Sequence, residues 1–190
     1  MFGPDSATMS AVNAATAATD LARTAPAGAA GRRARRAEPQ WLDPVEMAAW
    51  RGFIELQGPL LMALEAGLAP HGLTIGDYEV LVRLSETEGH QMRMCDLAAQ
   101  LRLSPSGLTR RLDGLVKGEL VRREPSSNDR RVMLATITDH GMRVLEDAAP
   151  DHADDVRRLF LAPLSRSELH ALGTAFVKIR GCVDAEGAVS

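Results

Sequence analysis

The chain has 190 residues, of which 45% are hydrophobic and 25% charged, with a formal net charge of −3 and two cysteines. This length and composition predict one ordinary globular domain with a hydrophobic core. They exclude a membrane span, since no apolar run approaches the ~18 residues required, and a disulfide framework, since Cys95 and Cys182 lie far apart. We expect no secretory signal and a location in the cytoplasm.

The charges are distributed unevenly along the chain. Residues 41–89 carry two arginines against eight acids, whereas residues 90–131 carry nine lysines or arginines against five acids. A local basic excess matters more for phosphate binding than the total charge does. The distribution therefore favours a nucleic-acid contact within residues 90–131.

Residues 1–39 are rich in Ala, Thr, Gly and Pro and hold almost no large apolar side chains. Such a segment cannot bury enough surface to offset the entropy of ordering, which predicts a disordered N-terminal tail. The arginine cluster at residues 32–36 is interpreted as part of a solvated tail, with a contact to nucleic acid as the alternative.

The first expected helix covers residues 43–68, with Asp43 as N-cap, Pro44 at its first position and Glu46 completing the cap. We expect a kink at Gly58-Pro59. Its apolar members are Met47, Trp50, Phe53, Ile54, Leu60, Leu61 and Leu64.

A second helix is predicted from Thr74 to about residue 86, followed by a short strand at residues 91–94 and a helix at residues 95–101. Ser104 is placed to cap a further helix that runs to about Gly118, with Pro105 at its first position. Its inward-facing residues recur at helical spacing and are Leu108, Leu112, Leu115 and Val116.

Residues 120–124 and 131–137 are predicted to be strands joined by a polar loop, which makes a β-hairpin. Thr138 is the expected cap of a helix that runs toward Leu161 and is kinked or interrupted at Pro150. Ser165 caps the last helix, with Glu168 completing a capping box. The predicted fold class is mainly α with a small β-hairpin wing, and the long first and last helices have apolar faces suited to dimerisation.

The helix that Ser104 begins is the strongest functional signal. A DNA major groove admits one α-helix, whose N-terminal turns meet the base edges, and an arginine there can grip guanine with two hydrogen bonds. The alternative is an amphipathic helix with a solvated polar face. The predicted DNA-binding residues of this helix are Ser104, Ser106, Gly107, Thr109, Arg110 and Arg111.

The tip of the hairpin is the second signal and comprises Asn128, Asp129, Arg130 and Arg131. Arginines enter narrow minor grooves because the potential there is strongly negative. Asp129 is then expected to brace the arginines and the turn through charge-assisted hydrogen bonds. An ordinary charged hairpin tip is the alternative.

These residues carry a family resemblance. The pattern Leu97-Ala98…Leu103-Ser104-Pro-Ser-Gly-Leu-Thr-Arg110…Leu112-Asp113…Leu115, then Leu120-Val121-Arg-Arg123, Asp129-Arg-Arg131 and Ile137-Thr-Asp-His-Gly141, closely resembles the MarR family of bacterial transcription regulators. The resemblance runs from Trp41 to Cys182. One departure is Glu119, at a place where the family usually has glycine, and it predicts an altered exit from the DNA-reading helix.

The resemblance implies a winged helix-turn-helix domain over residues 40–183. Its DNA-binding part would cover residues 74–138, and its dimerisation helices residues 43–68 and 138–183. It implies a homodimer on a palindromic double-stranded DNA operator, acting most often as a repressor. Release by a small aromatic or phenolic effector, or by oxidation, is the usual mode of control in the family.

The candidates for an effector cleft are Trp50, Phe53, His71 and Tyr78. Core packing is the alternative for the aromatic residues, because they recur at helical spacing. Cys95 is expected to be buried or inert. The histidine spacing predicts no metal site, and we expect no cofactor.

The sequence favours a sequence-specific DNA-binding regulator as the function. A winged-helix module for protein–protein interaction is the alternative. We do not expect an enzyme, because the sequence holds no phosphate-binding glycine loop, nucleophile elbow or metal motif.

Overall fold

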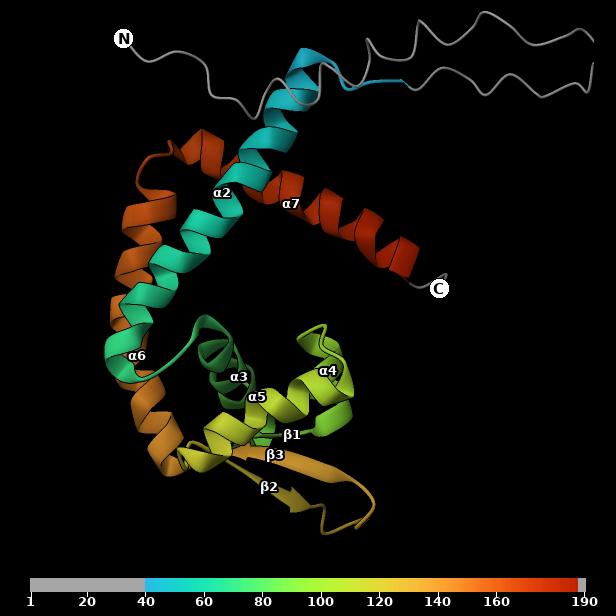
Figure 1. The fold of residues 1–190 in the computed structure, drawn as a ribbon, viewed down its shortest axis with the longest axis vertical. Coiled ribbons are helices and arrows are strands. Elements are labelled where there is room, and N and C mark those ends of the chain that lie inside the picture. The colour runs from blue at the N-terminus through green and yellow to red at the C-terminus, as the bar shows by residue number, and fades with distance from the viewer. Residues whose placement is uncertain (1–39, 188–190) are drawn as a thin grey trace, which may run out of the picture. The chain divides into compact units, whose positions relative to one another are not determined.

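In the computed structural model, the described residues are 40–187, so the predicted disorder of residues 1–39 and the arginine cluster within them lie outside it. The described part is mainly helical, with a small three-stranded sheet (Figure 1), as the sequence predicts. Its elements in chain order are α2 (Pro44–Leu68), α3 (Ile75–Ser85), β1 (Gln91–Arg93), α4 (Met94–Gln100), α5 (Pro105–Lys117), β2 (Val121–Pro125), β3 (Met133–Ile137), α6 (Asp139–Val156) and α7 (Arg166–Gly187). None of the helices among these residues is long and apolar enough to cross a membrane.

The predicted helix starts are confirmed by side chains that satisfy free backbone N–H groups. The Asp43 carboxylate accepts from the N–H of Glu46 at 2.9 Å, while the Glu46 carboxylate accepts from the N–H of Asp43 at 2.8 Å. Thr74 and Asp77 form the same reciprocal capping box at α3. A residue and its partner three positions later make each cap, so local sequence is sufficient to predict it.

Neither proline inside a helix interrupts it. Pro59 lies within α2 and Pro150 within α6, and both helices continue through the proline. The interruption considered at Pro150 is therefore wrong, and the alternative of a kink there stays a prediction. The irregularity in this region comes later, where α6 passes into a π-helical turn at Arg157–Leu161.

The hairpin is confirmed and joins a larger sheet. The strand order is β1-β3-β2, and both pairings are antiparallel. Val121 pairs with Ile137 in the hairpin, and Met92 of β1 pairs with Ala135. The short strand predicted near residue 91 thus covers the free edge of β3, which leaves β2 as the outer strand of the hairpin.

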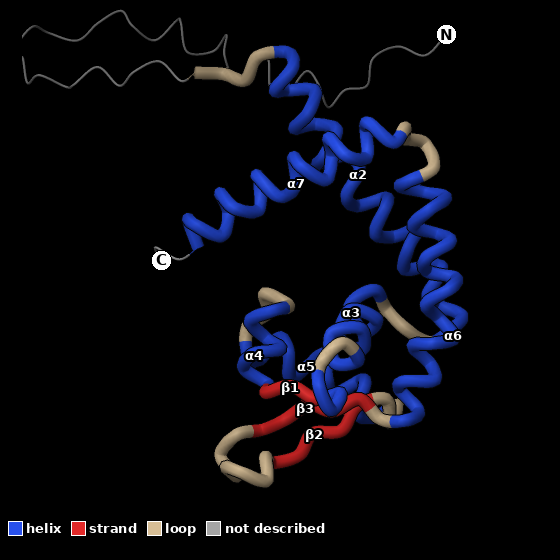
Figure 2. The backbone as a smooth tube through the Cα atoms, turned by 180° about the vertical axis from the view of Figure 1, so that it is seen from behind, coloured by secondary structure: helices blue, strands red, loops and turns tan. Residues whose placement is uncertain are grey.

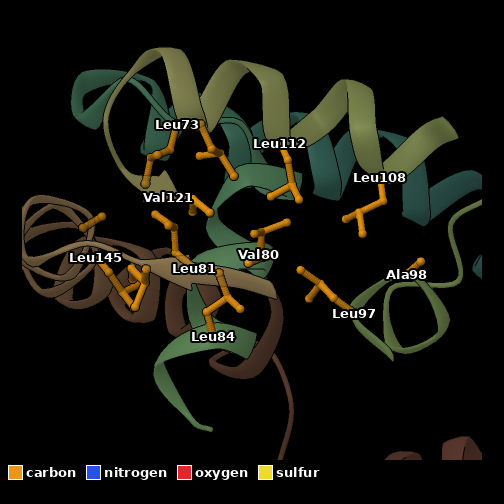
Figure 3. Close-up of a cluster of buried hydrophobic side chains, with 14 of the residues drawn as sticks. Leu73, Val80, Leu81, Leu84, Leu97, Ala98, Leu108, Leu112, Val121 and Leu145 are labelled. Carbon is orange, nitrogen blue, oxygen red and sulfur yellow. The ribbon is translucent and has the colours of Figure 1, made fainter. Parts of the chain in front are cut away.

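The core lies between α3, α4, α5, the sheet and the first turns of α6 (Figure 3). Of the α5 residues predicted to face inward, Leu108, Leu112 and Leu115 are buried and Val116 is half-buried. Burial of such leucines contributes roughly 1.5–3 kcal/mol each. The remaining members of the cluster are Leu68, Leu73, Val80, Leu81, Leu84, Leu97, Ala98, Val121, Ala135, Ile137, Leu145 and Ala148.

The apolar side chains of α2 and α7 contrast with this core because many are exposed. Both helices lie away from the hairpin (Figure 2). Trp50 is 53% exposed, Phe53 51% and Val177 73%. The other large exposed apolar residues on these helices are Val45, Ile54, Leu56, Leu61, Met62, Phe176, Ile179 and Val183.

Candidate nucleic-acid interface

The interface begins at the N-terminus of α5, where Ser104 caps the helix. Its Oγ accepts the N–H of Gly107 at 3.1 Å and lies 3.2 Å from the Oγ of Ser106. Both serines are exposed. Free N–H groups and the positive end of the helix dipole make such a terminus favourable for a phosphate.

One face of α5 presents polar side chains to solvent. Ser106, Thr109 and Arg110 are exposed, while Leu108 and Leu112 point into the core. The Thr109 hydroxyl donates to the carbonyl of Pro105 at 2.9 Å, so it can accept a hydrogen bond and its methyl group is free to contact thymine. Within residues 40–187, no carboxylate lies within ion-pair distance of Arg110, whose guanidinium is available to a ligand.

Arg111 does not stand on that face. It is half-buried and its guanidinium lies against α3, where a Cβ added to Gly76 would collide with it. The glycine therefore makes room for the arginine beside α3. Of the two adjacent arginines predicted to bind DNA, the structure leaves Arg110 outward and packs Arg111 sideways.

The tip of the hairpin is an ordered turn that presents two arginines. The Asp129 carboxylate accepts the N–H of Arg131 at 3.0 Å, and the Asp129 carbonyl accepts the N–H of Val132 at 2.9 Å. Asp129 thus braces the backbone of the turn as predicted, but it forms no ion pair with an arginine side chain in the described part of the chain. Arg130, Arg131 and Asn128 are exposed.

An ion pair that the sequence does not predict joins the hairpin to α5. Nη2 of Arg123, on β2, donates to Oδ1 of Asp113 at 2.6 Å, and the arginine side chain is only 27% exposed. Neighbouring Arg122 instead pairs along its own strand, with Glu124 at 3.2 Å. Nothing in the sequence indicates which of the two arginines faces the helix, because that depends on the strand's orientation.

The exit from α5 follows the usual glycine geometry although glutamate stands there. Glu119 has a φ of 59°, in the left-handed region. Its N–H bonds to the carbonyl of Val116 at 3.0 Å, and the N–H of Leu120 bonds to that of Leu115 at 2.9 Å, which together form a Schellman cap. The glutamate thus takes the left-handed conformation at the cost of backbone strain, and an exit that differs from the family's stays a prediction.

A cavity of about 350 Å³ lies between α3 and α6. The rings of Tyr78 and His152 contact each other in its lining, with centroids 4.4 Å apart and planes tilted by 44°. Burial raises the pKa of Tyr78 and lowers the pKa of His152, against which the negative charge of Asp155 acts. Nε of Arg83 and Nδ1 of His152 are buried without a hydrogen-bond partner among the described residues. The lining residues are Ile75, Tyr78, Glu79, Val82, Arg83, Glu86 and His152.

Of the four residues predicted for an effector cleft, only Tyr78 lines this cavity. Trp50 and Phe53 lie side by side on the exposed surface of α2, with centroids 6.1 Å apart, so within one chain they are not core residues either. Nε2 of His71 pairs with the carboxylate of Asp151 at 2.9 Å. A single chain does not bring the four together.

The cysteines and histidines add no second site. Cys95 and Cys182 are both exposed, so Cys95 is not buried, and the alternative expectation that its thiol is inert stays a prediction. The Cys95 thiol lies 3.5 Å from Oδ1 of Asp96. No group of three or more potential metal ligands occurs among residues 40–187.

Comparisons with known proteins find similarity to transcriptional regulators. The family model for the MarR family matches residues 73–133. AbsC, a MarR family transcriptional regulator from Streptomyces coelicolor, is 39% identical with a TM-score of 0.74, over 77% of this chain and 99% of AbsC. Sco3205, another such regulator from that organism, solved in complex with DNA, is 32% identical with a TM-score of 0.71, over 76% of this chain and 91% of Sco3205. The transcriptional repressor MprA of Escherichia coli (strain K12) is 28% identical over 123 residues, which is 65% of this chain and 69% of MprA.

Proposed function

The chain belongs to the MarR family of transcriptional regulators, and from that premise we propose that it is a homodimeric repressor of a palindromic operator. The observation that carries the proposal is the outward face of α5, where Arg110 is exposed beside Ser106 and Thr109 and has no ion-pair partner among residues 40–187. The DNA in the Sco3205 structure and the name of MprA support operator binding and repression. Because the proposed operator is chromosomal DNA, we propose that the protein acts in the cytoplasm.

Each part of the interface has a distinct role in this proposal. Arg110 contacts base edges in the major groove, where two hydrogen bonds to guanine are worth roughly 1–3 kcal/mol of discrimination. Ser104 and Ser106 at the start of α5 bind phosphate and fix the register of the helix. Arg130 and Arg131 reach the neighbouring minor groove from the hairpin tip.

Dimerisation is supported by the apolar surfaces of α2 and α7. A single chain leaves Trp50, Phe53, Ile54 and Val177 substantially exposed, and several large apolar side chains exposed on two helices favour an interface. A two-fold pair presents two copies of α5, whose half-sites lie about 34–36 Å apart, one turn of DNA. We accordingly assign residues 74–138 to DNA binding and residues 43–68 and 138–183 to dimerisation.

The cavity between α3 and α6 is where we place a small aromatic or phenolic effector. The ring of Tyr78 offers an aromatic contact surface in its lining. Nε of Arg83 and Nδ1 of His152 are buried there without a partner among the described residues, and they would bond a ligand after a side chain moves. A ligand that prefers one arrangement of the dimer shifts the population toward or away from the DNA-competent state. The exposed pair Trp50 and Phe53 belongs instead to the dimer surface.

Salt dependence of binding tests the proposal. A duplex selected from random-sequence DNA should bind with log affinity falling linearly against log salt, with a slope near −5 for about six phosphate contacts. Arg130→Ala or Arg131→Ala should weaken this binding by about tenfold while sedimentation still shows a dimer. A protein–protein adaptor would give a flat salt profile and no selected sequence, and that result would refute the proposal.

A further inference from the structure

Thr138 lies where the end of α5, the end of β3 and the start of α6 meet. Its N–H donates to the carbonyl of Leu120 at 3.0 Å, and its hydroxyl donates to the carbonyl of Glu119 at 2.7 Å and lies 3.2 Å from that of Leu120. The same hydroxyl oxygen accepts the N–H of Gly141 at 2.9 Å, which caps α6. One side chain therefore binds the carbonyls that follow α5 and an N–H that begins α6.

Gly141 brings the two segments into direct contact at the same point. It is buried, and a Cβ there would collide with the carbonyl oxygen of Leu120 and lie 2.9 Å from Cγ1 of Ile137. Any larger residue would push the first turn of α6 away from the segment that leaves α5. Because the contact is made by backbone atoms, it leaves the two helices little freedom to turn independently.

From this junction α6 continues along the core of the domain and also contacts α2. This helix packs against α2 and α3, and its residues Leu145 and Ala148 are buried. Since α2 carries the exposed apolar surface assigned to dimerisation, α6 connects that surface to the exit of α5. A rigid joint at Thr138 would transmit the position of one to the other.

Building on the proposed operator binding, we propose that the junction of Thr138 and Gly141 sets the direction of α5 relative to α6. In the dimer it thereby fixes the separation of the two reading helices. Thr138 is a positioning residue in this proposal, since it acts on DNA only through α5. Its two hydrogen-bonding roles are separable, because capping α6 needs an acceptor and holding Glu119 needs a donor.

Thr138→Asp separates the two roles. An aspartate is a good N-cap for α6 but has no proton to donate to the carbonyl of Glu119. The probe is a duplex selected by the unaltered protein from random DNA, together with versions in which one or two base pairs are added or removed between the half-sites. We expect the variant to remain a folded dimer, to lose tenfold or more in affinity for the selected spacing, and to discriminate poorly between spacings.

Three further variants isolate the cause. Thr138→Ser keeps both the donor and the acceptor, so it should retain the native affinity and the native preference for spacing. His140→Asp adds the same charge at an exposed position of the same helix turn and should weaken all spacings equally. Gly141→Ala disturbs the junction without a change of charge and should reduce spacing discrimination as Thr138→Asp does.

The spacing preference decides the outcome. Native discrimination between spacings in both Thr138→Asp and Gly141→Ala would overturn the inference. A loss of that discrimination in Thr138→Ser would overturn it as well. If the unaltered protein selected no duplex, the proposed function itself would fall and this inference with it. Far-ultraviolet circular dichroism and sedimentation of every variant separate a loss of fold or dimer from a loss of alignment.

Discussion

Arg123 of the hairpin and Asp113 of α5 form a hydrogen-bonded ion pair at 2.6 Å, which links the two elements assigned to DNA binding. The pair lies between β2 and the part of α5 that comes after its first turns. It holds the base of the hairpin against the helix, so the arginines at the hairpin tip keep a defined position relative to Arg110.

Asp113→Asn should lower the ratio of specific to non-specific DNA affinity by several-fold. Removing a negative charge strengthens non-specific binding to phosphates, while the released hairpin weakens specific binding. The effect on the free energy of unfolding should stay below about 1 kcal/mol because the pair is partly exposed. Glu124→Gln makes the same charge change in a pair confined to one strand, and an equal loss of specificity there would argue against a role for the helix–hairpin link.

Arg110→Ala should remove sequence preference at one position of each half-site. The structure presents its guanidinium to solvent, and a bidentate contact to guanine contributes roughly 1–3 kcal/mol of discrimination. Arg111→Ala is the matched control, because Arg111 packs against Gly76 and should affect stability more than base preference. Binding of single-base operator variants measures both, and an unchanged preference in Arg110→Ala would remove this residue from base recognition.

Glu119→Gly should raise the free energy of unfolding by about 0.5–1 kcal/mol. A non-glycine residue in the left-handed region costs about 1–2 kcal/mol, and part of the gain is offset by the greater entropy of glycine in the unfolded chain. Lys117→Gly, inside the last turn of α5, should instead destabilise by roughly 0.5–1 kcal/mol. Chemical denaturation of both variants provides the measurement, and a destabilised Glu119→Gly would contradict the Schellman geometry.

The stability of the protein should depend on pH through His152. Burial lowers its pKa in the folded state below the ordinary value near 6.5, so the unfolded chain binds the proton more tightly. This contribution is present above about pH 6.5 and is lost as the pH falls below it, toward the folded-state pKa.

The variant His152→Gln should flatten that part of the profile of stability against pH. Thermal unfolding measured from about pH 5 to about pH 8, in steps of about half a unit, follows the change. His140→Gln is the control, since His140 is exposed and lies outside the cavity. A native slope in His152→Gln would assign the pH dependence to other groups.

Local chemistry in the sequence determined the elements of this protein. Each capping residue, such as Asp43, Thr74 or Ser104, acts on an N–H three positions along, and the buried leucines of α5 recur at helical spacing. Such interactions span a few residues, so they can be read without knowing how elements pack. The outward position of Arg110 follows from the same periodicity.

Packing between elements decided what could not be predicted. The sideways placement of Arg111, the partnership of Arg123 with Asp113, the cavity beside Tyr78 and the exposure of Trp50 all depend on how helices and strands dock. The same holds for Thr138, whose hydroxyl donates to the carbonyl of Glu119. Thr138 follows the hairpin in the chain, whereas Glu119 precedes it. These contacts join residues distant in sequence, and their geometry exists only once the hydrophobic core has set the relative positions of the backbones.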